Sequence, residues 1–323
     1  SFVFSELWKP EFLSFGKIRA GYSRVGQGAG YAQTQLNYSL ASNPLGGFLF
    51  GGPSDSNIPN SHLLASSATE IEVGTELAFA QNRLRLDLTV YKKKSTGEIV
   101  NTPASITSGY SGAVLNAGEL ENKGVEMLLT VLPVRTTDFT WTSSFNAAYN
   151  KSTVLSLAGG QLQSVYATSR SGVGFVGQQV GQPFGQVLAY DYKYNKDGSI
   201  ALTASGVPER GDLTAFGTAF HPWTLGWSND FVYKRFNLGV LIDGKFGAKI
   251  FSATDYYATI FGLRQETLVG REGTFGPDKL DAATYYGTLA NNVSKQFVQD
   301  ASFIKLRQLT LGDSFGNTLF GGK

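Results

Sequence analysis

Apolar and polar residues alternate with a period of two over long stretches of this chain. Residues 84–90 carry Leu or Val at every second position with Arg, Asp or Thr between them, and residues 71–79 follow a similar pattern. Successive side chains of a β-strand point to opposite faces, so each stretch predicts a strand with one apolar and one polar face. We expect eight such strands, near residues 15–26, 69–80, 83–94, 119–132, 138–150, 223–233, 236–247 and 301–312.

Three pairs of neighbouring strands fit together as hairpins with tight turns. In each pair, one register brings the apolar residues to a common face, and a slip of one residue would destroy this match. The predicted registers place Phe79 opposite Leu84, Val131 opposite Phe139 with Val125 opposite Phe145, and Tyr233 opposite Phe236. The corresponding turns are Gln81-Asn82, Val134–Thr136 and Lys234-Arg235, which have two or three residues, as hairpins usually do.

The segments between the hairpins are much longer than these turns. They cover residues 27–68, 95–118, 151–222 and 248–300 and are rich in Gly, Ser, Asn and Tyr. Tight turns and long loops therefore alternate, which places them at opposite ends of an antiparallel sheet. This arrangement is typical of a transmembrane β-barrel with short periplasmic turns and long extracellular loops. A soluble β-sandwich or β-solenoid would give the same alternation, but it explains the one-sided loops less well.

The apolar face of the three hairpins is the surface that a barrel presents to lipid. We expect Leu86, Leu88, Phe145, Trp227 and Leu238 to face lipid. Aromatic residues flank two of the turns, as in the interfacial girdles of membrane barrels. The three turns should then lie on the periplasmic side, and the segments 27–68, 151–222 and 248–300 outside the cell.

The composition excludes several classes of protein. The 323 residues include no Cys and only two His, which excludes a disulfide scaffold, a Cys-based zinc site and a Cys nucleophile. A net charge of +2 gives no reason to expect a nucleic-acid partner. No apolar run approaches the roughly 18 residues of a transmembrane helix. The absence of such a run does not exclude a β-barrel, because apolar and polar residues alternate along its strands.

The eight strands are expected to form only part of a barrel. The polar face carries many charged side chains beside other large side chains. A small closed barrel would have to bury these charges, whereas a larger barrel keeps them in a water-filled lumen. The first and last strands also lack an outer partner, and an unpaired strand edge cannot face hydrocarbon. We therefore interpret residues 1–323 as a partial barrel domain within a longer protein.

Six segments, in order, resemble a known family. Residues 116–126, Asn-Ala-Gly-Glu-Leu-Glu-Asn-Lys-Gly-Val-Glu, resemble a signature of the SusC/RagA-type TonB-dependent outer-membrane transporters of Bacteroidetes. The other segments are residues 13–22 (Leu-Ser-Phe-Gly-Lys-Ile-Arg-Ala-Gly-Tyr), 139–150 (Phe-x-Trp with Asn146 and Asn150), 181–186 (Gly-Gln-Pro-Phe-Gly-Gln), 229–236 (Asn-Asp-Phe-Val-Tyr-Lys-Arg-Phe) and 300–312. Two departures are the shortened stretch at 211–217 and Asp313, where the family usually has Tyr.

The resemblance implies the later part of a 22-stranded barrel, with the plug domain, the early strands and the final strands outside this sequence. It implies import of a large nutrient, an oligosaccharide or a peptide, driven by TonB and shared with a SusD-like surface lipoprotein. Such a protein is not an enzyme and needs no cofactor or metal. One alternative is a structural or accessory barrel subunit of a larger outer-membrane complex. Another is a secreted β-rich adhesin.

Loop aromatics are the candidates for binding a ligand. Aromatic rings on long loops can stack on sugars or contact peptides, and they can equally pack the loops together or meet a partner protein. The candidates are Tyr190, Tyr192, Tyr194, Tyr256, Tyr257, Tyr285 and Tyr286.

Other motifs carry weaker signals. Residues 172–177 match G-x-G-x-x-G but lack the flanking strand and helix of a dinucleotide site. His62 and His221 have no second ligand at metal-binding spacing. Glu70, Glu72 and Glu76 could be acid/base carboxylates, but ion pairing with Arg83 and Arg85 in a wet lumen fits them better.

Overall fold

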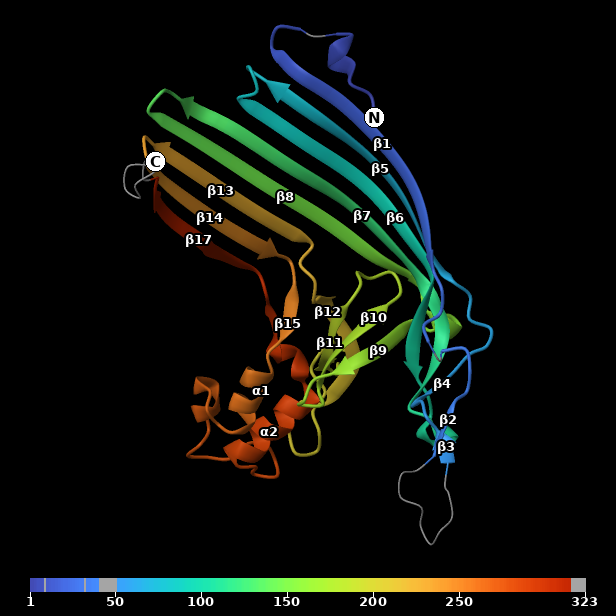
Figure 1. Cartoon of the computed structure of the whole chain (residues 1–323). Coiled ribbons are helices and arrows are strands. Elements are labelled where there is room, and N and C mark those ends of the chain that lie inside the picture. The colour runs from blue at the N-terminus through green and yellow to red at the C-terminus, as the bar shows by residue number, and fades with distance from the viewer. Residues whose placement is uncertain (9, 32, 41–50, 315–323) are drawn as a thin grey trace.

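The structure, a computed structural model, describes residues 1–8, 10–31, 33–40 and 51–314. Its largest part is a sheet in which eight antiparallel strands follow one another in chain order, and all eight correspond to predicted strands (Figure 1). We call this sheet the wall. Its strands are β1 (Leu13–Gln27), β5 (Ser66–Phe79), β6 (Leu84–Pro103), β7 (Gly112–Arg135), β8 (Phe139–Ser156), β13 (Trp223–Tyr233), β14 (Phe236–Phe246) and β17 (Phe303–Asp313).

Tight turns join neighbouring strands at one end of the wall, and long segments join them at the other (Figure 1). The first and third hairpins have the predicted registers, with Phe79 opposite Leu84 and Tyr233 opposite Phe236. In the first turn, residues 80–82 all have positive φ, between 49° and 65°. Residues other than glycine adopt this conformation mainly in turns, so the chain reverses within the short connection that was predicted.

The second hairpin forms, but its predicted register is wrong by four residues. Phe145 lies opposite Leu129 rather than Val125. The predicted strand ended at residue 132, whereas β7 continues through Pro133 to Arg135. The pairing is irregular between Val131 and Val134, which lets the ladder pass a proline that has no N–H to donate. Because the shift at Phe145 is even, its side chain stays on the predicted face.

The long loop predicted at residues 95–118 is also wrong. Strands β6 and β7 remain paired as far as Pro103 and Gly112, so only residues 104–111 connect them. This connection contains the 3-10 helix η3 (Ile106–Ser108), and the short β4 (Asn57–Ile58) joins β7 in parallel beside it. The remaining elements of the N-terminal part are η1 (Phe4–Glu6) and the β2–β3 hairpin (Tyr38–Leu40 and Gly51–Pro53).

The segments 157–222 and 247–302 fold together into a body beyond the loop end of the wall, which we call the loop body (Figure 1). It contains a four-stranded sheet and two α-helices that the sequence did not predict. Its elements are η4 (Ala158–Gly160), β9 (Gln163–Thr168), β10 (Gly174–Gln179), β11 (Gln186–Tyr192), β12 (Arg210–Thr218), β15 (Lys249–Phe251), α1 (Ala253–Ile260), η5 (Gln265–Leu268), α2 (Ala282–Asn292), η6 (Ser294–Phe297) and β16 (Val298–Asp300).

A small apolar core holds the loop body together. Val173, Tyr256, Ala290 and Phe297 are each at most 5% exposed and pack against one another. Buried Ser294 links this core to the sheet, since its hydroxyl donates to the Val173 carbonyl at 2.6 Å and accepts from the Tyr190 N–H at 2.9 Å. Segments more than 100 residues apart in the sequence therefore share one core.

The wall has two chemically different faces. Leu86, Leu129, Phe145 and Trp227 form a single cross-strand row, so the predicted apolar face is continuous over four strands. On the edge strand β17, the outward side chains of Ile304, Leu306, Leu309 and Leu311 are 61–79% exposed. We call this apolar side the outer face and the opposite, polar side the inner face. Lipid contact of the outer face stays a prediction.

Aromatic pairs mark both ends of the outer face. Trp141 stacks on Phe231 near the turns, with ring centroids 5.6 Å apart. Tyr149 packs against Trp223 near the loop end, at 4.6 Å. Aromatic residues in these two positions are typical of the interfacial girdles of a membrane barrel.

The wall is an open sheet whose outermost strands are β1 and β17 (Figure 1). The described strands therefore do not close into a barrel, and the assignment of further strands outside this sequence stays a prediction. In the part of the chain that is described, no helix is both long and apolar enough to cross a membrane.

Candidate ligand-binding site

Charged side chains on the inner face pair across three strands. Glu76 and Asp87 lie directly opposite each other, as predicted. Arg19 of β1 bridges them, at 2.9 Å from Glu76 and 2.6 Å from Asp87, and Lys17 also reaches Glu76 at 2.9 Å. The sequence assigned this role to the diagonal Arg85, which makes no ion pair among the residues described. The cation comes from the other neighbouring strand because β1 also pairs with β5, in a register that the sequence did not reveal.

A pocket of about 390 Å³ lies where the inner face meets the loop body. Asn122 of β7 and Asn150 of β8 line the wall side, with Asn150 Nδ2 3.5 Å from Asn122 Oδ1. Lys245 of β14 supplies a cation to the lining. The other lining residues are Leu120, Ser152 and Thr224 from the wall and Phe184, Ala219, Phe220 and His221 from the loop body.

Two phenylalanines form the loop side of this pocket. The rings of Phe184 and Phe220 lie 5.5 Å apart, and the Phe184 N–H donates to the Ser152 hydroxyl at 3.0 Å. Between them, Gly185 has a φ of 70°, and a Cβ at this position would fall 2.5 Å from the Phe220 ring. Only glycine combines this conformation with so close an approach. The segment 181–186 thus fixes an aromatic surface against the wall.

His221 holds the junction of the loop body and the wall. Its Nε2 lies 3.0 Å from the carbonyl oxygen of Ala301, and its ring packs edge-on against Phe303 at 5.6 Å. A carbonyl oxygen only accepts hydrogen bonds, so Nε2 carries the proton. The geometry gives His221 a structural role at the rim of the pocket.

The lining can bind a polar ligand without covalent chemistry. Amide and hydroxyl groups of Asn122, Asn150, Ser152 and Thr224 can exchange hydrogen bonds with sugar hydroxyls or peptide amides. The faces of Phe184 and Phe220 offer apolar contact to a sugar ring or an apolar side chain. The pocket is therefore chemically suited to oligosaccharides and to peptides.

The seven candidate tyrosines lie in the loop body, and most of them pack its elements together. Tyr256 is 5% exposed, with its hydroxyl donating to Asn291 at 2.8 Å, and burial raises the pKa of this phenol. Tyr190 and Tyr257 pack against the same core. Tyr285 stacks on Phe275 with ring centroids 4.2 Å apart, and Tyr286 packs edge-on against the same ring at 5.7 Å. Packing accounts for the position of these five rings, and their role in binding stays a prediction.

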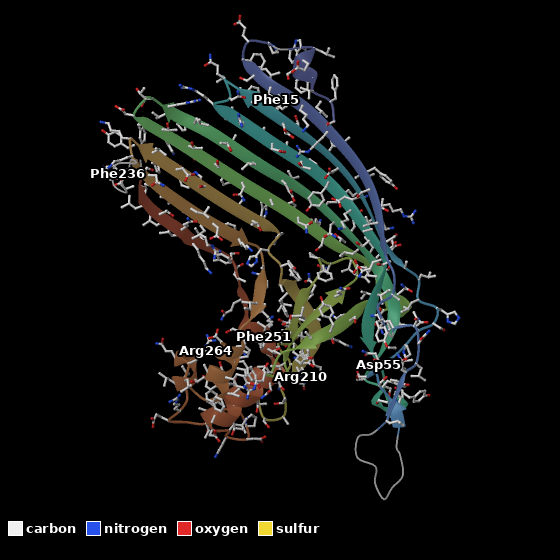
Figure 2. All side chains as sticks on the ribbon, viewed as in Figure 1. Phe15, Asp55, Arg210, Phe236, Phe251 and Arg264 are labelled. Carbon is white, nitrogen blue, oxygen red and sulfur yellow. The ribbon has the colours of Figure 1, made fainter. Side chains whose placement is uncertain are left out.

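Tyr194 is the exposed member of the set, and Tyr192 lies beside it. Tyr194 is 52% exposed and lies 6.3 Å from the Tyr192 ring. The ammonium of Lys295 sits 4.8 Å over Tyr192 and pairs with Asp191 at 2.5 Å. The hydrogen bond to Asp191 raises the pKa of Lys295, so this lysine remains charged throughout the physiological range. Figure 2 shows the neighbouring Arg210 and Phe251 inside the loop body, far from Phe236 at the turn end.

The remaining sequence motifs take structural positions. Gly172 to Gly177 lead into strand β10 and not into a helix, which removes the geometry of a dinucleotide site. Asn195 to Ser199 form a turn, in which the Gly198 N–H donates to the Asn195 carbonyl at 3.0 Å. His62 lies in the exposed segment before β5, and its Nδ1 is 3.3 Å from the Ser61 hydroxyl.

Sequence reasoning did not identify the pocket, although four of its residues lie in motifs that carried the family resemblance. These residues are Leu120, Asn122, Asn150 and Phe184. Asn122 and Phe184 are 62 positions apart, and only the pairing of β7 with β8 and the docking of the loop body bring these residues together. Phe220 and Lys245 lie outside the quoted motifs, and no pattern in the sequence singles them out.

Comparison with known proteins gives a consistent result. The sequence model of the family "TonB dependent receptor-like, beta-barrel" matches residues 7–205, more than half of the chain. The TonB-dependent receptor P3 of Formosa agariphila is 23% identical, and the match covers 94% of this chain and 33% of that protein. The TonB-dependent receptor SusC of Bacteroides thetaiotaomicron is also 23% identical, with 94% and 32% covered. The chain thus spans about a third of the length of these relatives.

Solved structures show the same fold. The chain superposes on the structure of the RagAB peptide transporter with a TM-score of 0.76 and 18% identity, covering 100% of this chain and 37% of that one. The "closed-closed" state of the RagAB peptide importer gives a TM-score of 0.79 at 17% identity, with the same coverage. The relatives are receptors and transporters and not enzymes. The wall, the one-sided loops and these matches together show that the chain belongs to the TonB-dependent receptor-like β-barrel family.

Proposed function

We propose that this chain forms the later part of the barrel and the extracellular loops of an outer-membrane importer that is driven by TonB. Its cargo is a large nutrient, an oligosaccharide or a peptide. The pocket between the inner face and the loop body carries this proposal. It combines hydrogen-bonding groups of the wall with the aromatic surface of Phe184 and Phe220, at the loop end of the lumen.

The two faces of the wall support a position in the outer membrane. The outer face exposes large apolar side chains over several strands, a surface that is costly in water and favourable in lipid. The inner face carries the Arg19–Glu76–Asp87 cluster, which needs a wet lumen. The similarity in fold to RagAB, which is described as a peptide transporter, supports a peptide as one class of cargo.

A surface of the loop body fits a partner protein at the extracellular side. Phe261, Leu263, Leu268 and Val269 follow α1 and are 69%, 78%, 55% and 66% exposed. Apolar residues gathered on one exposed loop are typical of a protein interface. We propose that a SusD-like surface lipoprotein covers this surface and closes the lumen from outside, with TonB acting from the periplasm through a region outside this sequence.

Uptake by the whole protein tests the proposal. We expect Phe220→Ala and Asn122→Ala to lower uptake of the cargo and its affinity for the purified complex, measured with oligosaccharide and peptide libraries. Asn195→Ala, in the exposed turn, is the matched control and should leave both unchanged. Deleting the TonB system should abolish uptake. The opposite outcome has three parts: the whole protein binds neither cargo, its loss leaves uptake intact, and its loss disrupts a larger membrane complex. That outcome would establish a structural role instead.

A further inference from the structure

Three lysines form a row across three strands of the wall. Lys92 of β6 lies opposite Lys123 of β7, which in turn lies opposite Lys151 of β8. All three side chains are exposed, with 57% and 55% for Lys92 and Lys123. Like charges placed directly opposite one another destabilise a sheet. An arrangement of this kind calls for a counter-charge.

The row lies on the outer face and not in the lumen. Each lysine is two residues along its strand from an outward apolar residue, Val90, Val125 or Tyr149, and side chains two apart share a face. Tyr149 also packs against Trp223 in the aromatic pair that marks the loop end of this face. The lysines therefore stand at the level where a barrel leaves hydrocarbon and enters the headgroup layer.

The protein supplies only part of the counter-charge. Glu121 lies 2.9 Å from Lys92 and 2.6 Å from Lys123, and Glu119 lies 2.7 Å from the neighbouring Lys94. Four lysines thus face two glutamates. In the part of the chain that the structure describes, Lys151 takes part in no ion pair. Positive charge is left unbalanced at the end of the row on β8.

An apolar groove runs from this row toward the turn end of the wall. Its volume is about 460 Å³, and the three lysines lie at one end of it. Its other lining residues are Ile71, Val73, Val90, Tyr91, Gly124, Val125 and Tyr149. The first three of these side chains are 51–54% exposed. The small side chains of Val73, Val90 and Val125 leave a channel beside the larger Tyr149.

We propose that this groove is a binding site for a phosphorylated lipid of the outer leaflet. An acyl chain lies along the valines, and the phosphate meets Lys123 and Lys151. The channel is apolar, and its headgroup end carries an excess of cations that includes Lys151, which is in no ion pair among the described residues, so the site favours an anionic lipid over a neutral one. The site is distinct from the cargo pocket, because it lies on the other face of the wall. It rests on the proposed position of the barrel in the outer membrane, with the loop end outside.

Lipid that remains bound to the purified whole protein tests the site. We expect native mass spectrometry of the detergent-solubilised protein to show one retained phosphorylated lipid per barrel. In Lys123→Gln/Lys151→Gln, retention should fall about tenfold, because each interfacial lysine strengthens attraction to an anionic lipid several-fold. Val125→Trp, which fills the groove without changing charge, should lower retention as well. Lys93→Gln, on the inner face of the adjacent strand β6, is the control for loss of a lysine and should retain the lipid.

Two results would overturn the site. One is equal retention of phosphorylated lipid by the double variant and the wild type, when a heat-modifiable electrophoretic mobility shows that both proteins are folded. The other is retention of neutral lipid only, which would mean that the lysines merely extend into the headgroup layer. Because retention is measured without cargo, a failed uptake experiment leaves this result intact, and a failed lipid experiment leaves the uptake result intact.

Discussion

The wall and the loop body were built from the same chain by different rules. Each wall strand pairs with its neighbour in sequence, and every second residue points to one continuous apolar face. The loop body instead joins residues far apart, since Ser294 bonds to Val173 across 121 positions. Strands can be predicted from sequence periodicity where the two faces of a sheet meet different surroundings, because apolar and polar residues then alternate. A core assembled from distant segments leaves no such period.

The largest expected effect comes from a mutation in the core of the loop body, which should destabilise the loop body and leave the wall intact. Phe297 is 1% exposed, and truncating a buried phenylalanine costs about 3–5 kcal/mol. We expect Phe297→Ala to raise hydrogen exchange throughout the loop body of the whole protein while β5 and β6 stay protected. Phe261→Ala, at a residue 69% exposed, is the control and should change neither region. Faster exchange in the wall as well would show that the two regions unfold together.

The wall should be most sensitive to charge on its outer face. An arginine near the middle of the lipid face costs about 2–4 kcal/mol, so Leu86→Arg should lower the free energy of unfolding of the whole protein in lipid vesicles by that amount. Leu128→Arg places the same residue on the inner face of the neighbouring strand, where the cost should be much smaller. Equal costs at the two positions would contradict the assignment of the faces.

A smaller effect is expected from the ion cluster of the inner face. Arg19→Ala leaves Glu76 and Asp87 opposite each other without their bridging cation. Because both carboxylates are more than a third exposed, solvent screening limits the loss to about 1 kcal/mol. The loss should shrink in high salt. Arg24→Ala, in the same strand but outside this cluster, provides the control, and an equal loss there would argue against the pairing.

The smallest effect is a pH dependence confined to the loop body. The hydroxyl and N–H of Ser302, with Lys249, hold the pKa of Asp300 at about 2. An unfolded Asp titrates near 3.9. The folded value is the lower one, so Asp300 stabilises the loop body fully above about pH 5 and loses this contribution as the pH falls toward 2.

Asp300→Asn should remove that dependence. The denaturant midpoint of the loop body can be followed with a fluorophore on Asp197→Cys, since the chain has no other cysteine. The wild-type midpoint should fall between pH 5 and pH 2 more steeply than that of Asp300→Asn. Parallel pH profiles for the two proteins would show that Asp300 does not contribute.

Much of the wall could be predicted from the sequence, and the exceptions have physical causes. Two of three hairpin registers follow from the requirement that apolar residues share a face. The register of the second hairpin was wrong because a bulge near Pro133 changes the count of residues without changing the pattern. The sequence did not predict that β6 continues through residues 95–103 or that β7 begins at residue 112. These ends of the two strands lie beyond the apolar face, so their sequences lose the alternation of apolar and polar residues.

The candidate site was less predictable than the wall. Tyrosines were reasonable candidates by residue type, but the same type also builds cores, and Tyr256 is buried in one. The pocket depends on the contact of Phe184 with Ser152, which joins a loop to the wall across 32 positions. Neither side of that contact has a periodic signal, so only the assembled structure brings the residues together.

The most direct test of the account compares two adjacent leucines of β7. Leu129 lies on the outer face and Leu128 on the inner face, one residue apart in the same strand. In the whole protein in lipid vesicles, a spin label at Leu129 should be relaxed by lipid-soluble oxygen, and one at Leu128 by an aqueous nickel reagent. Contact of Leu129 with nickel and protection from oxygen would contradict the two-faced wall on which the proposed importer depends.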